Sequence, residues 1–382
     1  MAGIYIHIPF CKQACSYCNF YFLTRRELQQ PFVDALIEEI RSYRGHPFSE
    51  QVFQTIYIGG GTPSLLSIQQ LESIFGTLHD VFDIEAGEVT LEMNPDDVTK
   101  EFLRDIRGIG INRASMGIQS FDPDLLLSMH RAHNPREAQS ALEMIQQTNF
   151  PSFTADLIYG NPGQTSAALE KDIMRLLSYD PPHVSAYSLT IEPNTRLGKQ
   201  VKLGRIEEPD EEKVAEQFDL VEENLSSHGL MRYEISNFSK PGKEAVHNSN
   251  YWRHINYLGL GPSAHSLFWQ DAGAIRWNNA KDIRTYLNKE WASLREDEQQ
   301  LDLKDLAEER LMLGLRTRWG VSPGRLADKY GYKFSSSQLQ WLGRQKKENI
   351  FEERDNSLRL SAEGLRIADY LTLELISRHS SS

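Results

Sequence analysis

The sequence has little cysteine, no long apolar run and no surplus of basic charge, and each shortage excludes a class of protein. Of its 382 residues three are cysteines, Cys11, Cys15 and Cys18. An odd number of cysteines cannot all be paired, and structural disulfides are rarely packed into so short a segment. We therefore expect metal ligands or reactive thiols in a reducing compartment.

The charge balance and the apolar pattern limit the partners. The chain has 53 acidic and 41 basic residues and a net charge of -12. It has no surplus of basic residues to bind the phosphates of a nucleic acid, so we expect no nucleic-acid partner. No apolar run has the length that a membrane span needs, and any membrane partners are expected to be peripheral clients. Residues 1–8 resemble neither a signal peptide nor a transit peptide and are typical of a β-strand. We expect a cytoplasmic protein that begins with this strand.

Short apolar runs alternate with helical patterns over residues 1–195. Runs that are apolar on both faces are typical of strands in a parallel sheet. Amphipathic helices lie between them, one with apolar residues at 33, 36, 37 and 40, another with Ser67 as its expected N-cap. The predicted strands are Gly3–Ile8, Gln54–Ile58, Glu88–Met93, Ala114–Ile118, Thr154–Ile158 and Val184–Leu189.

Six strand–helix units fit either a barrel or a doubly wound sheet. Nearly every polar or glycine-rich cluster follows the carboxyl end of a strand, where barrel enzymes build their sites. A doubly wound sheet concentrates such clusters at one switch point. The sequence therefore predicts an α/β fold with an incomplete (β/α)6 barrel over residues 1–195.

The pattern changes after residue 195. Residues 196–300 are aromatic and glycine-containing, and we expect them to close the barrel; an acidic run at Arg295–Gln300 is typical of a linker. Residues 301–382 show three helical patterns and then two short strands, which predicts a small winged-helix-like module. Because the whole chain is acidic, a role in partner contact or as a lid is favoured over DNA binding.

The cysteine motif, Cys11-x3-Cys15-x2-Cys18, lies in a loop directly after the first predicted strand. Three thiolates cannot complete a closed four-ligand site, but they can hold a 4Fe-4S cluster and leave one iron open. The open iron can be chelated by an amine and a carboxylate, as in S-adenosylmethionine (SAM). Catalytic zinc and a redox thiol pair are the alternatives at this point.

The segment from Tyr5 to Cys18 resembles the radical SAM superfamily. Within it, the chain resembles the group that contains oxygen-independent coproporphyrinogen III dehydrogenase (HemN) and the HemW-type haem chaperones. The resemblance covers almost the whole chain. It rests on Gly59-Gly60-Gly61-Thr62-Pro63, Glu92 in Leu-Glu-Met-Asn-Pro, Gln119 in Gly-Ile-Gln-Ser-Phe, Arg131 in Met-His-Arg-Ala-His and Asp156 in Asp-Leu-Ile-Tyr-Gly.

The resemblance implies a set of site residues. Cys11, Cys15 and Cys18 would hold the 4Fe-4S cluster, and an arginine would meet the SAM carboxylate with its forked donors. The residues implied to contact SAM are Tyr5 and Tyr17 near the cluster, Gly60, Gly61 and Thr62 through their backbone, Glu92 and Asp156 at the ribose or amine, Gln119 at the ribose, and Arg131 at the carboxylate.

Two features separate the members of this group. The dehydrogenase pattern continues with a fourth cysteine where this chain has Phe20. The segment His247-Asn248-Ser249-Asn250-Tyr251-Trp252 matches the HNxxYW signature of HemW-like proteins. Through that likeness His247 becomes the expected haem ligand, with Tyr251 and Trp252 packed on the macrocycle.

Three functions therefore compete. The first is a haem chaperone that binds haem, a 4Fe-4S cluster and SAM and delivers haem to haemoproteins. The second is an oxygen-independent coproporphyrinogen III oxidase, and the third is a radical SAM enzyme on an unknown substrate. Phe20 and His247 favour the chaperone. The resemblance further implies acceptor haemoproteins, a low-potential electron donor and a homodimer as partners.

Overall fold

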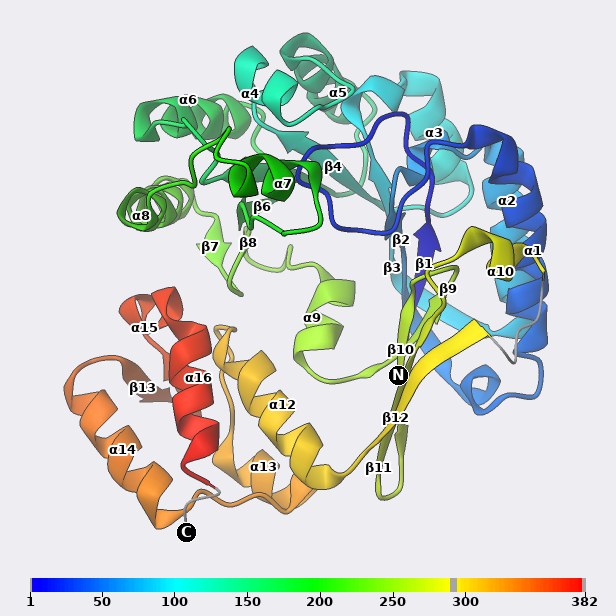
Figure 1. Ribbon diagram of the computed structural model, residues 1–382. Coiled ribbons are helices and arrows are strands. Elements are labelled where there is room, and N and C mark those ends of the chain that lie inside the picture. Colours follow the sequence, from blue (N-terminus) through cyan, green and yellow to red (C-terminus); the bar gives the residue numbers. More distant parts are fainter. Residues whose placement is uncertain (1, 289–293, 380–382) are drawn as a thin grey trace.

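The computed structural model describes residues 2–288 and 294–379, and its main feature is one twelve-stranded sheet (Figure 1). The strand order is β12-β11-β10-β9-β1-β2-β3-β4-β5-β6-β8-β7. Six neighbouring parallel strands form its centre: β1 (Ala2–Ile8), β2 (Val52–Gly60), β3 (Asp83–Met93), β4 (Arg113–Gln119), β5 (Phe153–Tyr159) and β6 (His183–Ser188).

These six strands stand in sequence order, which is the order of a barrel and differs from the reversed order of a doubly wound sheet. Helices follow the strands and lie on an outer arc (Figure 1). The incomplete (β/α)6 barrel predicted from the sequence is confirmed. The helices of this part are α1 (Gln29–Ser42), α2 (Ile68–Val81), α3 (Lys100–Gly108), α4 (Pro123–Ser128), α5 (Pro135–Gln147), α6 (Ser166–Leu177), α7 (Arg196–Lys202) and α8 (Glu211–Ser227), with short 3-10 turns at Arg26–Leu28, Pro47–Glu50, Pro63–Leu65 and Pro95–Asp97.

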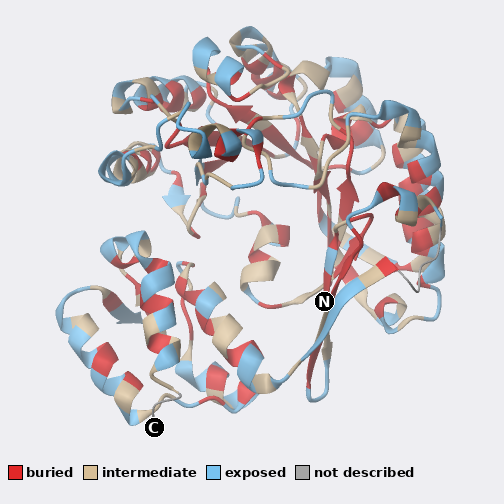
Figure 2. Cartoon of the chain, viewed as in Figure 1, coloured by how far each residue is buried: buried red, intermediate tan, exposed pale blue. Residues whose placement is uncertain are grey.

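Local sequence explains these elements. In β1, Ile4, Ile6 and Ile8 alternate along the strand and are fully buried under the helices. Ser67 caps α2 in a capping box with Gln70, as its position predicts. Buried residues concentrate in the sheet and on the inner faces of the helices (Figure 2). The resulting core holds the carboxyl ends of the strands in fixed positions.

Residues 196–300 lengthen the sheet at both ends, and the expectation that they close the barrel is wrong. β8 (Asn237–Ser239) and β7 (Met231–Arg232) pair antiparallel beyond β6. β9 (Asn256–Leu260) pairs parallel with β1, and β10 (His265–Gln270) and β11 (Gly273–Asn279) continue antiparallel. Within the described ranges the two edge strands, β7 and β12, are not paired with each other. Helices α9 (Val246–Trp252) and α10 (Ile283–Leu287) belong to this region.

The acidic run predicted as a linker is strand β12 (Arg295–Leu301), paired antiparallel with β11. Its side chains are mostly exposed, and it is largely pale blue in Figure 2. The linker prediction failed because an edge strand with solvent on its side chains needs no apolar pattern. Charged residues on an edge also prevent pairing with other chains.

The C-terminal residues form a second module with its own apolar core (Figure 1). The three predicted helices are α12 (Leu303–Leu315), α13 (Pro323–Tyr330) and α14 (Ser336–Lys347), followed by the hairpin β13 (Phe351–Arg354) and β14 (Ser357–Leu360). Helices α15 (Ala362–Arg366) and α16 (Ala368–Ser377) were not predicted; α16 packs on α12. None of the helices in the described part of the chain is long and apolar enough to cross a membrane.

Candidate functional site

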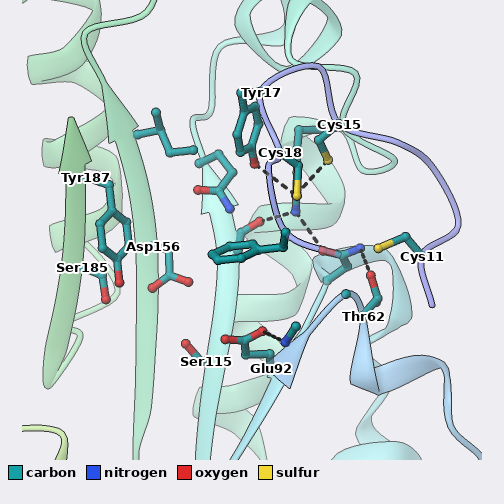
Figure 3. Close-up of a pocket in the computed structure, with 18 of the residues that line it drawn as sticks. Cys11, Cys15, Tyr17, Cys18, Thr62, Glu92, Ser115, Asp156, Ser185 and Tyr187 are labelled. Atoms are coloured by element: carbon teal, nitrogen blue, oxygen red, sulfur yellow. Dashed lines mark hydrogen bonds between the residues drawn. The ribbon is translucent and has the colours of Figure 1, made fainter. Parts of the chain in front are cut away.

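A cavity of about 540 Å³ opens at the carboxyl ends of the barrel strands (Figure 3). The cysteine loop between β1 and α1 forms one wall, and side chains from β2 to β6 form the others. Most of the residues implicated by the sequence motifs meet here: Cys11, Cys15, Tyr17, Cys18, Gly60, Gly61, Thr62, Glu92, Gln119, Arg131 and Asp156.

Backbone hydrogen bonds hold the cysteine loop in place. Cys11 N donates to Leu23 O at 2.9 Å, which closes the loop on itself. Ser16 anchors its middle to the segment after α4, where its N donates to Met129 O at 2.9 Å and its Oγ donates to Ser128 O at 3.1 Å. The loop therefore presents its three thiols from a fixed backbone.

The thiols are half-buried and unpaired with one another. Burial raises the pKa of the Cys11 thiol to about 12 and also raises the pKa of Cys18. Cys15 and Cys18 lie close together in Figure 3, while Cys11 lies apart, beside Thr62.

No set of three histidine, cysteine or carboxylate side chains in residues 2–288 and 294–379 is arranged around the position of a single metal ion. The donor set of the loop is three sulfur atoms, the type that iron–sulfur clusters take.

One carboxyl group, Glu92, lies near the end of β3, and another, Asp156, lies in the middle of β5. Glu92 Oε1 accepts a hydrogen bond from the Tyr57 hydroxyl at 2.7 Å, and its Oε2 accepts from Gly60 N at 3.0 Å. Burial raises the pKa of Glu92, and burial raises the pKa of Asp156 to about 7. Because Asp156 Oδ1 is buried without a partner in the described part of the chain, this carboxyl is the freer of the two to bind a ligand.

The glycine motif after β2 is required by close packing. A Cβ on Gly61 would come within 2.8 Å of the Ile8 carbonyl oxygen, and Gly60 has a φ of 106°, which favours glycine. The N–H groups of Gly60, Gly61 and Thr62 all donate to protein oxygens. These N–H groups are thus engaged, and it is the carbonyl oxygens of the motif that can accept hydrogen bonds from the amine of a ligand.

Gln119 and Arg131 lie side by side against Gly117. Gln119 ends β4 with a φ of 64°, a left-handed conformation that non-glycine residues rarely adopt. Arg131 Nη2 donates to Asn94 Oδ1 and to the Gly117 carbonyl oxygen, both at 2.8 Å. Arg131 Nη1 lies 3.5 Å from Cys15 Sγ, so this guanidinium links the motif after β4 to the cysteine loop.

Within residues 2–288 and 294–379, buried polar atoms of three of these residues have no hydrogen-bond partner: Gln119 Oε1, Arg131 Nε and Asp156 Oδ1. Unpaired buried polar atoms are costly, and a polar ligand in the cavity would satisfy them. An acceptor, a cationic donor and a carboxyl at one cavity match the hydroxyl, carboxylate and amine groups of SAM. The residues present therefore fit the cofactor.

Several lining residues were not singled out from the sequence, among them Arg113 and Ser115 on β4 and Ser185 and Tyr187 on β6. Ser115, Ser185 and Tyr187 are labelled in Figure 3. The members of each pair stand two residues apart on strands that otherwise carry small or apolar residues. Side chains two apart on a strand share a face. This polar alternation in an apolar strand was the available signal for interior positions of the barrel.

Tyr5 is not part of this cavity. Its side chain lines a second cavity on the other side of the Asn19–Phe20 segment, and its hydroxyl bonds His7 Nδ1 at 3.0 Å. The ring stacks on Tyr57 with centroids 6.2 Å apart. Tyr5 and His7 share one face of β1, and both line this second cavity rather than the cavity of the cysteines.

His247 lies outside both cavities and is only 1% exposed. Its Nδ1 bonds Thr55 Oγ1 at 2.8 Å, and its Nε2 bonds the Tyr251 hydroxyl at 2.8 Å. Both ring nitrogens are thus engaged, so this geometry does not fit iron ligation by His247. Tyr251 lines the second cavity, whereas Trp252 lines neither, and its carbonyl oxygen accepts from Arg310.

Comparison with known proteins assigns the family. The model of the radical SAM superfamily matches residues 5–176, and that of the HemN C-terminal domain matches residues 301–367. The heme chaperone HemW of Bacillus subtilis (strain 168) is 36% identical over 337 residues, 87% of this chain and 87% of that protein. The heme chaperone HemW of Escherichia coli (strain K12) is 32% identical over 78% of this chain and 79% of that protein.

A solved structure shows the same fold. Coproporphyrinogen III oxidase (HemN) from Escherichia coli, a radical SAM enzyme, superimposes with a TM-score of 0.83 and 21% identity over 97% of this chain and 89% of that one. At this identity the likeness concerns the fold alone. On the sequence relatives and the superfamily match, the chain belongs to the HemW family of radical SAM proteins.

Proposed function

We propose that this chain is a haem chaperone that binds haem, a 4Fe-4S cluster and SAM and delivers haem to acceptor haemoproteins. The observation that carries the proposal is its likeness, over most of its length, to proteins named heme chaperone HemW. Phe20 supports it, because the dehydrogenase pattern has a fourth cysteine at this place.

In this proposal Cys11, Cys15 and Cys18 hold the cluster. The cluster would supply an electron to SAM bound at its open iron. Asp156 and Gln119 would bind the ribose or amine, since each has an unpaired buried oxygen. Arg131 would place the SAM carboxylate beside Cys15 through its unpaired Nε. The remaining proposed contacts come from Tyr17, Glu92 and the carbonyl oxygens of Gly60, Gly61 and Thr62.

The second candidate is a coproporphyrinogen oxidase, favoured by the match of residues 301–367 to the model of the HemN C-terminal domain. The two are separated by incubating the anaerobically reconstituted chain with SAM, a reductant and either coproporphyrinogen III or haem. A chaperone takes up haem and leaves coproporphyrinogen unchanged. Formation of protoporphyrinogen would contradict the chaperone, and a coproporphyrinogen III dehydrogenase assayed in parallel shows that the conditions permit conversion.

Partners follow from the same proposal. A cluster that is reduced in use needs a low-potential electron donor, and a chaperone needs acceptor haemoproteins, including peripheral membrane clients. We also propose a cytoplasmic location, which keeps the thiols reduced, and a homodimer. Size-exclusion chromatography with light scattering, with and without cluster and haem, tests the homodimer.

A further inference from the structure

A second cavity, of about 450 Å³, lies between β1, β9 and β10 on one side and α12 on the other. The cysteine loop covers one end of it. Asn19 and Phe20 line this cavity and the barrel cavity, so the two are neighbours across the loop. Of the residues implied to bind SAM, Tyr5 lines the second cavity and the others do not.

The walls of this cavity are largely aromatic. Tyr251 and Tyr257 meet edge to face with ring centroids 4.8 Å apart, and Tyr5 and Tyr21 line the side next to β1. Phe20 is 71% exposed at the cavity edge. Exposed large apolar side chains beside a cavity mark a binding surface, and tyrosine and phenylalanine rings suit a flat apolar ligand.

His265 offers a free imidazole to this cavity. It begins β10, and its ring makes no hydrogen bond with any described residue. The other histidines of the cavity are engaged. His7 bonds the Tyr5 hydroxyl at 3.0 Å and the Tyr21 carbonyl oxygen at 2.8 Å. His254 bonds the Tyr330 hydroxyl at 3.3 Å and lies 3.5 Å from Glu309.

Charge at the rim complements an anionic group. Lys281 lines the cavity and forms no ion pair among the described residues. Glu309 also lines it, but its two oxygens both accept from Arg276 Nη2 at 2.5 Å. The acidic group is thus neutralised, and the lysine is available to a carboxylate.

We propose that this second cavity is the haem site, with His265 as the imidazole ligand to iron and Lys281 as the partner of a haem carboxylate. The inference rests on the proposed chaperone function. A flat macrocycle contacts the tyrosines and Phe20, an iron atom needs a free imidazole, and a propionate needs a cation. Each requirement is met by a residue of this cavity.

The HNxxYW segment then acts through Tyr251. His247 holds the Tyr251 hydroxyl at 2.8 Å and is itself held by Thr55. His247 is therefore a positioning residue: it lies outside the haem site and orients the Tyr251 side chain, which lines it. The two histidines have separable roles: loss of His247 displaces a wall, and loss of His265 removes an iron ligand.

The test is an anaerobic haem titration of the full, cluster-reconstituted chain, read by Soret absorbance and by the electron paramagnetic resonance of the ferric haem. His265→Ala is expected to lose affinity by about tenfold or more and to lose the imidazole-ligand spectrum. Added imidazole restores that spectrum. His247→Ala weakens binding but keeps the spectrum. His79→Ala, an exposed histidine on the outer helix α2, is the matched control and binds haem as wild type does.

The outcomes separate the site from the function. If wild type takes up no haem, the chaperone proposal fails and the site fails with it. If wild type binds haem and His265→Ala shows the same affinity and spectrum, the site alone is overturned. Loss of the imidazole spectrum in His247→Ala, with His265→Ala unchanged, would assign the iron to His247.

Discussion

The two cavities beside the cysteine loop have opposite kinds of wall. The barrel cavity is built from carboxyl, amide and guanidinium groups, and some of their buried atoms lack partners. The second cavity is built from tyrosines, and at its rim the His265 imidazole and the Lys281 ammonium have no polar partner among the residues that the structure describes. The difference indicates that one loop serves two ligands, a polar cofactor on one side and a flat apolar ligand on the other.

The arrangement of the strands explains this separation. Strands β2 to β6 bring their carboxyl ends to the cysteines, as parallel strands of a barrel do. Strands β9 and β10 are added beyond β1, so their side chains face α12 rather than the barrel interior. The second cavity therefore depends on the part of the chain that lengthens the sheet.

The largest effect is expected from Cys18→Ser, because a cluster held by three thiolates cannot lose one without losing affinity for iron. Iron and sulfide content should fall about tenfold or more. Haem affinity should stay near that of wild type, since Cys18 does not line the second cavity.

The matched variant is Phe20→Ala, which keeps all three thiols. It should show the reverse pattern, with full iron and sulfide content and weaker haem binding. If both variants lost both ligands together, the two cavities would form one functional site and the comparison would fail.

The next effect concerns Asp156. Its folded-state pKa of about 7 is raised by burial above the value of about 4 in an unfolded chain. Burial therefore makes the ionised Asp156 carboxyl unfavourable in the folded chain. The protein keeps its full stability while the carboxyl is protonated, below about pH 4, and loses this contribution as the pH rises from about 4 to about 7. Without SAM, Asp156→Asn should raise the free energy of unfolding at pH 8 by on the order of 2 kcal/mol and change it little at pH 4.

Thermal unfolding of both proteins at pH 4 to 8 measures this difference. The same variant should bind SAM more weakly, because the polar contact is lost. An equal change in Tm at every pH would show that the Asp156 carboxyl is not held protonated by burial.

A smaller effect is expected from Thr55→Val, which keeps the side-chain shape and removes the hydroxyl that bonds His247 Nδ1. A buried ring nitrogen without a partner costs about 1–3 kcal/mol of stability. Haem affinity should fall modestly without a change of the haem spectrum. Thr55→Ser keeps the hydroxyl and serves as the control; a spectral change in Thr55→Val would point to His247 as a ligand.

The smallest effect is expected from Lys281→Ala. A rim ion pair in water contributes about 0.5 kcal/mol, or roughly a twofold change in haem affinity. The loss should be larger at low salt and vanish at high salt, since exposed charges are screened. Lys281→Arg should bind as wild type does. A salt-independent loss would indicate that the side chain acts by packing and not by charge.

Much of the barrel was predictable from the sequence. The six central strands are apolar runs, and their burial on both faces makes this pattern strong. The residues implied to bind SAM were identified through the resemblance to the radical SAM superfamily. They lie together because the carboxyl ends of parallel strands meet at one end of a barrel. The start of α2 was also predictable, because a serine side chain such as that of Ser67 can accept a hydrogen bond from the first turn of a helix.

The second cavity was not predictable in the same way. β12 carries acidic residues on an exposed edge and so gives no apolar signal. The environments of Tyr5 and His247 depend on how residues 196–300 pack against β1 and β2: β9 pairs with β1, and His247 bonds Thr55 on β2. A motif indicates which residues matter, but their hydrogen bonds decide whether a ring nitrogen is free. His265 had no motif around it, and only the cavity singles it out.

A crystal structure of the anaerobically reconstituted chain with haem and SAM would test the account most directly. We expect haem between β10 and α12 with its iron bound to the His265 imidazole, and SAM in the barrel cavity beside Asp156 and Arg131. Iron bound to His247, or a macrocycle inside the barrel against Asp156, would contradict it.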